Sequence, residues 1–172
     1  MSKLTKILLT FVIISALSFL SFIGTEIYLE TNFKKNCSEY IELAARSTTV
    51  ELAKENLVKA IAFVEEHNLT SGNSSIFVKY PNNDIEFWYK NLVETYSSLE
   101  KLDGNSVLEN SNVLMKLESL TTQTDKGQKA IYPDNIYEYP NQIFLFWWGI
   151  LSGFVCIGCI LTFLAKFSIY YE

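Results

Sequence analysis

The sequence predicts a mainly α-helical membrane protein in which two transmembrane helices flank a small helical extracytoplasmic domain. Three observations predict this fold class: an uncharged apolar run near each end, basic residues beside both runs, and helical spacing of apolar residues between them. The chain of 172 residues leaves room for one domain between the runs. We expect transmembrane helices over residues 7–24 and 143–165, an extracytoplasmic domain over 25–142, and cytoplasmic tails over 1–6 and 166–172.

The first apolar run, Ile7 to Ile23, contains about 17 residues without a charged side chain. This length is close to the shortest that crosses a hydrocarbon core of roughly 30 Å. A cleaved signal peptide is the alternative, because Lys3 and Lys6 precede the run and Ala16-Leu17-Ser18 resembles a cleavage site. The apolar run continues past that site, so we expect a retained transmembrane helix.

The second apolar run, Ile143 to Ala165, is longer and has aromatic residues at its outer end. Its roughly 23 residues would span about 34 Å as an α-helix, enough to cross a bilayer with some tilt. Amphipathic rings collect at the headgroup level of a bilayer, and a lysine marks the opposite boundary. The predicted interface anchors are Tyr137, Tyr139, Trp147, Trp148 and Lys166.

Charge is distributed unevenly along the chain. The flanks outside the two runs carry about +2, whereas the segment between them carries about −7. Short loops rich in lysine stay in the cytoplasm, so both termini should be cytoplasmic. The net charge of −5 argues against a nucleic-acid partner, which would require clustered basic residues. The short tails favour a bacterial inner membrane, where the Asn-X-Ser/Thr sequences at Asn36, Asn68 and Asn73 would not be glycosylated.

Small residues form one face of the second run. Gly149 and Gly153 make a GxxxG motif, and Ser152 and Cys156 continue the same face. Small side chains let another helix approach closely, so that dispersion contacts accumulate in lipid. The neighbour could be the first run of the same chain, a second copy, or a larger membrane protein. Besides the lipid bilayer, a membrane protein partner or a homodimer is therefore expected.

Residues 25–67 contain no proline or glycine and are permissive for a long helix. Apolar residues recur at helical spacing through this stretch, and Glu55 with Lys59 supplies an i,i+4 ion pair. We expect one helix that continues from the first span and runs almost unbroken to Glu66. The inward positions are predicted to be Leu43, Val50, Ala53, Leu57, Ile61 and Val64.

The next part of the domain is predicted to hold a short strand and a second helix. Ser74–Tyr80 alternates apolar residues and is compatible with a strand. Pro81 and the Asn-Asn-Asp cluster that ends at Asp84 should terminate the strand and cap a helix that reaches Leu102.

A third helix is expected over Ser106–Leu120, after a turn at Asp103-Gly104-Asn105. Residues 121–128 are predicted to form a polar loop. Residues 130–139 contain Pro133, and Pro140 follows them directly. The segment resembles an extended return to the membrane, which could pair with residues 76–80 as a two-stranded ribbon.

Phe87, Trp88 and Tyr89 are the candidate partner or ligand surface. Three consecutive helical residues sweep about 200°, so they cannot all face one core. Trp88 fits the inward stripe, which leaves Phe87 or Tyr89 near a surface. Burial beneath Ser74–Tyr80 is the structural alternative, whereas exposed aromatic residues are typical anchors of interfaces.

No residue pattern predicts a cofactor or a metal site. Cys156 and Cys159 form a CxxC inside the second run without a second pair, and we interpret them as packing residues. His67 lacks other ligands at metal-binding spacing and is interpreted as a solvated helix terminus. Cys37 should lie outside and near the bilayer, in an intermolecular disulfide or as a free or buried thiol.

The sequence contains no catalytic constellation, so we expect a protein that is not an enzyme. The first hypothesis is an accessory or structural membrane protein that binds a partner through its outer domain and small-residue face. The layout over residues 1–166 also resembles the input half of bacterial chemoreceptors and sensor kinases, without a shared motif. That resemblance implies a sensor or small-ligand-binding module. Only about six residues follow the second span, so its signal would have to pass laterally to another membrane protein.

Overall fold

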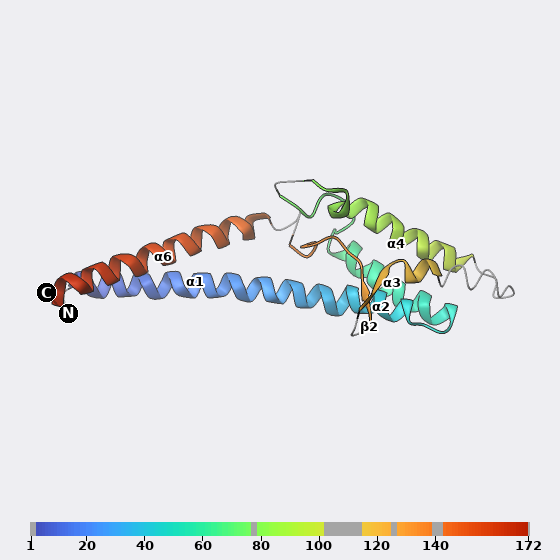
Figure 1. Ribbon diagram of the computed structural model, residues 1–172, viewed down its shortest axis with the longest axis horizontal. Helices are drawn as coiled ribbons and strands as arrows, with labels where there is room; N and C mark the ends of the chain where they lie inside the picture. Colours follow the sequence, from blue (N-terminus) through green and yellow to red (C-terminus); the bar gives the residue numbers. More distant parts are fainter. Residues whose placement is uncertain (1–2, 77–78, 102–114, 125–126, 139–142, 172) are drawn as a thin grey trace. The chain divides into compact units, whose positions relative to one another are not determined.

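The chain divides into two compact units in the computed structural model. The first, called the apolar hairpin below, comprises Met1–Tyr28 with Gln142–Glu172, and the second, called the helical domain, comprises Leu29–Asn141. Helices account for most of the described residues (Figure 1), which confirms the expectation of a mainly helical chain. The structure describes residues 3–76, 79–101, 115–124, 127–138 and 143–171.

Two long helices form the apolar hairpin. Helix α1 spans Lys3–Phe33, with its last residues in the helical domain, and helix α6 spans Ile143–Tyr171. Both stretches are long and apolar enough to cross a membrane, within Lys6–Ala45 and Ile143–Lys166. Figure 1 shows the start of α1 and the end of α6 at the same end of this unit, so the two helices run antiparallel.

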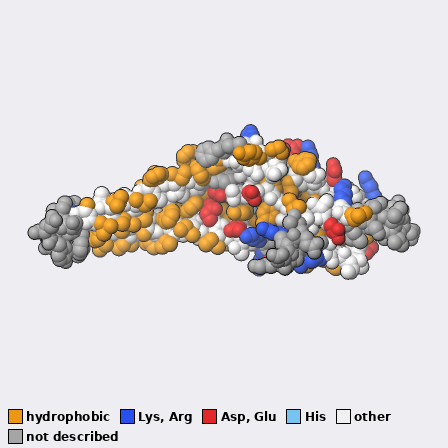
Figure 2. All heavy atoms as spheres, viewed as in Figure 1, with side chains coloured by type: hydrophobic (Ala, Val, Ile, Leu, Met, Phe, Trp, Pro, Cys, Tyr) orange, Lys and Arg blue, Asp and Glu red, His pale blue; other side chains and the backbone are white. Residues whose placement is uncertain are grey.

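The large apolar side chains of the hairpin are mostly exposed. Leu17 of α1 is 61% exposed and Phe154 of α6 is 72% exposed. Figure 2 shows hydrophobic side chains over the visible face of these helices, whereas acidic and basic side chains gather over the helical domain. The two helices therefore leave most of their apolar surface without a protein neighbour within the described residues.

The helical domain is built from a run of helices. A π-helical turn, η1, follows α1 directly and leads into α2, and a turn then separates α2 from α3. A short 3₁₀ turn, η2, precedes α4. Their bounds are Lys34–Ser38 for η1, Glu39–Ala45 for α2, Val50–Glu66 for α3, Pro81–Asn83 for η2 and Ile85–Glu100 for α4.

The expectation of one helix that is almost unbroken to Glu66 is wrong. The helix ends at Ala45, and α3 begins at Val50 after Thr49 adopts an extended conformation. The Thr49 hydroxyl accepts the Leu52 backbone N–H at 3.3 Å, and the Ser47 hydroxyl donates to the Leu43 carbonyl at 2.7 Å. Hydroxyl side chains compete in this way for backbone groups, which makes consecutive Ser and Thr residues suitable for a helix end and a cap.

This break also changes which residues face the core. Leu43 is 47% exposed rather than inward, and the buried residues of α2 are Ile41, Ala44 and Ala45. The helical phase is not continuous between α2 and α3, so one periodic pattern cannot describe both. Ala53, Leu57 and Val64 of α3 are buried as expected, and the Lys59–Glu55 pair forms at 2.8 Å. The core of the domain includes Phe33, Cys37, Ile41, Leu57, Ile85, Leu92, Leu99, Leu117 and Ile136.

A β ribbon forms where the sequence suggested a polar loop. Strand β1, Thr121–Thr124, pairs antiparallel with strand β2, Gly127–Ala130, with Thr121 opposite Ala130. β-Branched threonines favour strands, and the Ala130 backbone N–H donates to Glu42 Oε1 of α2 at 3.2 Å. The ribbon therefore packs against α2 through buried Thr121 and Ala130.

Other expectations for this region fail or lie outside the described residues. Residues 74–76 and 79–80 form no strand, and residues 131–138 form a loop and turns, so the expected pairing between these segments is wrong for the described residues. Residues 115–118 are helical and Leu117 is buried, whereas 102–114 lie outside the described residues. The alternation of apolar and polar residues near residue 76 thus did not predict which segments pair as strands.

Candidate functional site

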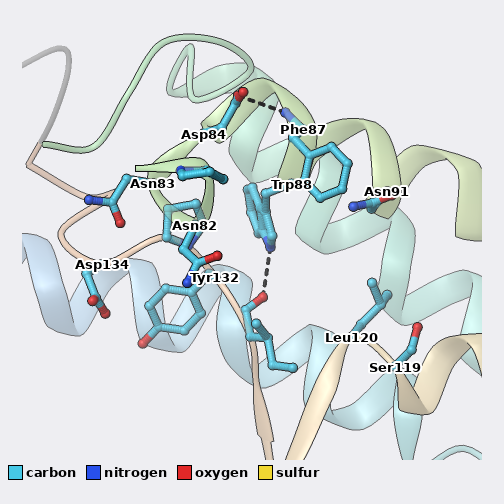
Figure 3. A pocket seen from close by; sticks show the side chains of 13 residues that line it. Asn82, Asn83, Asp84, Phe87, Trp88, Asn91, Ser119, Leu120, Tyr132 and Asp134 are labelled. Carbon is cyan, nitrogen blue, oxygen red and sulfur yellow. Dashed lines mark hydrogen bonds between the residues drawn. The ribbon is translucent and has the colours of Figure 1, made fainter. Parts of the chain in front are cut away.

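A pocket of about 440 Å³ lies in the helical domain at the N-terminal end of α4. Three segments line it: residues 81–91 of η2 and α4, residues 119–120, and residues 131–134 after β2. Figure 3 shows their side chains around the central indole of Trp88. Pockets of about 300–1,000 Å³ commonly hold small molecules, so this site has the size for a ligand.

The start of α4 positions the polar edge of the pocket. Asp84 is extended and caps the helix, because its Oδ1 accepts the Phe87 backbone N–H at 3.0 Å, as the sequence predicted. A β-bridge to Asn73 holds Asp84 from the other side. The 3₁₀ turn that begins at Pro81 places Asn82 and Asn83 beside it in Figure 3. The Asp84 carboxylate is therefore held by a backbone N–H, and the two asparagines lie on the turn that precedes it.

Trp88 connects α4 to the segment after β2. Its Nε1–H donates to the Ile131 carbonyl at 2.8 Å, a contact across 43 residues of sequence. Its ring lies 6.5 Å from the ring of Phe33, and the side chain is buried. The Ile131 segment contacts Trp88 through this hydrogen bond, and the described residues 74–76 and 79–80 form no strand.

Phe87 and Tyr89 point to different surroundings. Phe87 is 64% exposed and lines the pocket. Tyr89 does not line it; its hydroxyl donates to Glu65 Oε1 of α3 at 2.6 Å. This hydrogen bond to a carboxylate raises the pKa of Tyr89 to about 12. The three predicted aromatic residues thus divide into a pocket wall, a buried anchor and a link between helices.

The segment at residues 131–134 contributes a wall that the sequence analysis did not identify. Tyr132 is half-buried, and its ring lies edge-on 4.9 Å from the ring of Phe33. Burial raises the pKa of the Tyr132 phenol. Pro133 and Asp134 complete this wall. The Tyr-Pro-Asp sequence was the signal that could have indicated this wall. Proline fixes φ and keeps such a segment out of a central strand, so a loop was to be expected here.

The charges that line the pocket have one sign. Asp84 and Asp134 are its charged side chains, and no lysine, arginine or histidine is among the residues that line it in the described part of the chain. The remaining wall consists of aromatic, proline, amide and aliphatic groups. This arrangement provides apolar contact, hydrogen-bonding amides and negative charge.

The small-residue face of α6 contacts α1 within the same unit. A Cβ placed on Gly149 would lie 2.5 Å from Cζ of Phe22, and one on Gly153 would lie 3.5 Å from Cε2 of Phe19. The Trp148 Nε1–H donates to Ser18 Oγ at 3.1 Å. Of the other residues on this face, Ser152 is buried and donates to the Gly149 carbonyl at 3.2 Å, while Cys156 is partly buried.

The expected interface anchors fall in different parts of the structure. Trp147 is exposed on α6, and Trp148 and Lys166 are partly buried there. Tyr137 instead packs against the core of the helical domain, where its ring lies 6.4 Å from that of Phe33. Tyr139 lies outside the described residues.

The three cysteines and the histidine lie at positions where they pack against neighbouring side chains or on a helix. Cys37 is a fully buried free thiol, and burial raises its pKa. Cys156 and Cys159 are partly buried on α6. His67 ends α3, where its ring stacks on Phe63 at 4.0 Å. No group of three or more potential metal ligands occurs among the residues that the structure describes.

The pocket and the hairpin contact are therefore the two features from which a function can be argued. Each is built from residues that are distant in sequence but joined by hydrogen bonds, Trp88 to Ile131 in the pocket and Trp148 to Ser18 in the hairpin. Comparison with protein-family models, curated proteins and solved structures finds no match for this chain.

Proposed function

We propose that the chain is a two-span integral membrane protein whose helical domain lies outside the cytoplasm. The observation that carries this proposal is the exposed apolar surface of α1 and α6, with side chains such as Leu17 and Phe154 facing no protein neighbour. Leaving one such side chain in water rather than in an apolar medium costs about 1.5–3 kcal/mol. Lipid removes that cost for both helices at once.

The proposed topology places both termini in the cytoplasm. The antiparallel course of α1 and α6 puts the start of one and the end of the other on the same side of a bilayer. Lys3, Lys6 and Lys166 lie at that end, whereas the segment between the spans carries about −7. The positive-inside rule then assigns the helical domain to the outside.

A pair of fusions tests this topology. An enzyme reporter that is active only outside the cytoplasm, inserted after Lys101 beyond the end of α4, should be active. The same reporter joined after Glu172 should be inactive. An active reporter at the second position and an inactive one at the first would overturn the proposal. An N-terminal epitope tag that is lost from the mature protein would identify residues 1–18 as a signal sequence and leave one span.

For the biochemical role, we propose a non-enzymatic accessory protein that binds a membrane protein partner through its helical domain. Phe87, Tyr80 and Ile131 are large exposed apolar residues of that domain, and two of them line the pocket. Exposed aromatic residues beside a pocket are typical interface anchors. We assign the small-residue face of α6 to contact with α1, because Phe22 lies against Gly149.

Purification in a mild detergent, followed by mass spectrometry, tests the accessory role. A partner should be recovered in fixed stoichiometry with the natural chain. Phe87→Asp should abolish its recovery, whereas Leu52→Asp should not, because Leu52 is also exposed but lies on α3 and does not line the pocket. Equal recovery with both variants would contradict this assignment.

A ligand-binding module is the second candidate, and the pocket at α4 is the observation that favours it. Its volume of about 440 Å³ and its mixture of aromatic and polar walls are typical of small-molecule sites. Under this function, a small solute should raise the melting temperature of the natural chain but not that of a Phe87→Asp variant. A partner without any solute effect would favour the accessory role.

A further inference from the structure

We propose that the pocket at the start of α4 binds an organic cation, namely a protonated amine on a short apolar chain. This inference rests on the second proposed function and names the class of ligand. Its first basis is the aromatic wall formed by Phe87, Trp88 and Tyr132. A cation is attracted to the face of an aromatic ring, and an apolar chain gains contact with the same surface.

The charge of the pocket provides the second basis. Asp84 and Asp134 line it, and no basic residue does so among the described residues. The N-terminus of α4 opposes a cation with about half a positive charge, but two carboxylates outweigh it. Asp84 also accepts the Phe87 backbone N–H, which removes one of the donors that an anion would otherwise use. The charged side chains that line the pocket therefore favour a positive ligand.

The rigidity of the walls provides the third basis. The indole of Trp88 is oriented by its hydrogen bond to Ile131, and Tyr132 is held edge-on against Phe33. Pro81 and Pro133 restrict the backbone on two sides of the pocket. Such groups need little reordering when a ligand enters, so little of the interaction energy is lost to conformational entropy.

Three probes of matched size separate charge from apolar contact. Butylammonium, butanol and butyrate share a four-carbon chain and differ in charge. The full chain in detergent micelles is titrated with each probe. The fluorescence of Trp88 reports binding in a Trp147→Phe, Trp148→Phe background, which leaves Trp88 as the single tryptophan of the original three. Butylammonium should bind more tightly than butanol, and butyrate more weakly than either.

Two variants and one control locate the site. Asp134→Asn should weaken butylammonium binding about fivefold, because it removes a nearby carboxylate charge. Phe87→Leu keeps an apolar side chain but removes the ring, and should weaken binding about threefold. Glu94→Gln removes one exposed negative charge from α4 away from the pocket and should leave the affinity unchanged.

An acetylated and amidated Ala-Lys-Ala peptide carries the same butylammonium group on a backbone. Tighter binding of the peptide would assign the cation to a lysine of a protein partner, and tighter binding of butylammonium would assign it to a free amine. Butanol or butyrate binding as tightly as butylammonium would overturn the cation assignment while leaving the ligand-binding function in place. Equal effects of Asp134→Asn and Glu94→Gln, or no response to butylammonium, would also overturn the cation assignment.

Discussion

The apolar hairpin and the helical domain use the same helical backbone with opposite arrangements of side chains. In the domain, one face of α3 and of α4 is buried against a shared core, and the charged side chains of these helices lie outside that core. In the hairpin, large apolar residues point outward around both helices. Helix formation alone therefore does not determine the surroundings of a segment. The position of its apolar side chains does.

The size of the exposed surface shows why this difference matters. Each fully exposed Leu or Phe forgoes about 1.5–3 kcal/mol of burial energy in water, and a folded domain is stable by only about 5–15 kcal/mol. The hairpin leaves many large apolar residues of both helices partly exposed, such as Leu17 at 61% and Phe154 at 72%, so each forgoes a share of that energy. We propose that lipid offsets this cost for the hairpin, whereas the helical domain buries many of its large apolar residues in its own core. Core burial is therefore the property to test in the helical domain, and contact between α1 and α6 is the property to test in the hairpin.

The largest expected effect comes from the core of the helical domain. Leu57 is fully buried in α3, whereas Leu52 on the same helix is 47% exposed. Leu57→Ala leaves a cavity and should lower the free energy of unfolding by about 2–5 kcal/mol. Leu52→Ala should lower it by less than about 1 kcal/mol. Thermal unfolding of the full chain in detergent, followed by near-UV circular dichroism, measures both. Equal losses would contradict the distinction between core and surface.

Some parts of this fold follow from local sequence signals. The two apolar helices, the cap at Asp84 and the inward residues Ile85, Leu92 and Leu99 were all predictable, because each depends on spacing or on a nearby hydrogen bond. The Lys59–Glu55 pair was predictable for the same reason. These features require only residues within one or two helical turns.

Other parts depend on contacts between distant residues. The turn at residues 46–49 interrupts a stretch without proline or glycine, and its Ser and Thr residues give only a weak local signal. The ribbon at residues 121–130 is anchored by Glu42, which lies 88 residues before Ala130. The wall of the pocket at residues 131–134 is fixed by Trp88. Periodicity cannot identify such partners, so the pocket was only partly predictable through Phe87 and Trp88.

Contact within the hairpin provides the second comparison. A Cβ on Gly149 would approach Cζ of Phe22 to 2.5 Å, whereas one on Gly153 would make ordinary contact at 3.5 Å with Phe19. Gly149→Ala should therefore destabilise the hairpin by about 1–2 kcal/mol through overpacking. Gly153→Ala should change its stability by no more than about 0.5 kcal/mol. Titration with a denaturing detergent measures the two variants.

A second substitution shows whether Phe22 causes the effect. Phe22→Ala removes the ring that Gly149→Ala would contact, so the cost of Gly149→Ala should disappear in the double variant. An unchanged cost would mean that another neighbour uses this face of α6. That result would favour a second copy of the chain or a membrane protein partner as the neighbour of the small-residue face of α6.

The smallest expected effect concerns the hydrogen bond that joins α3 to α4. The neutral Tyr89 phenol donates to Glu65, which raises the pKa of Tyr89 from 10.0 to about 12. In the unfolded chain the phenol loses its proton near pH 10, while the folded chain keeps it. The stabilisation is therefore fully present below pH 10 and is lost as the pH rises from 10 to about 12.

Comparison with Tyr89→Phe isolates this contribution, because the fold also raises the pKa values of Tyr96 and Tyr132. At pH 8 the variant should be less stable than the natural chain by less than about 1 kcal/mol, since the hydrogen bond is exposed and screened by solvent. The difference in melting temperature should shrink above pH 10 and vanish near pH 12. A difference that stayed constant with pH would show that Tyr89 stabilises the domain by packing. The contact between α3 and α4 would then not depend on the phenol proton that Tyr89 donates to Glu65. Because Glu65 and Tyr89 both lie within the helical domain, the hairpin variants should leave this pH dependence unchanged.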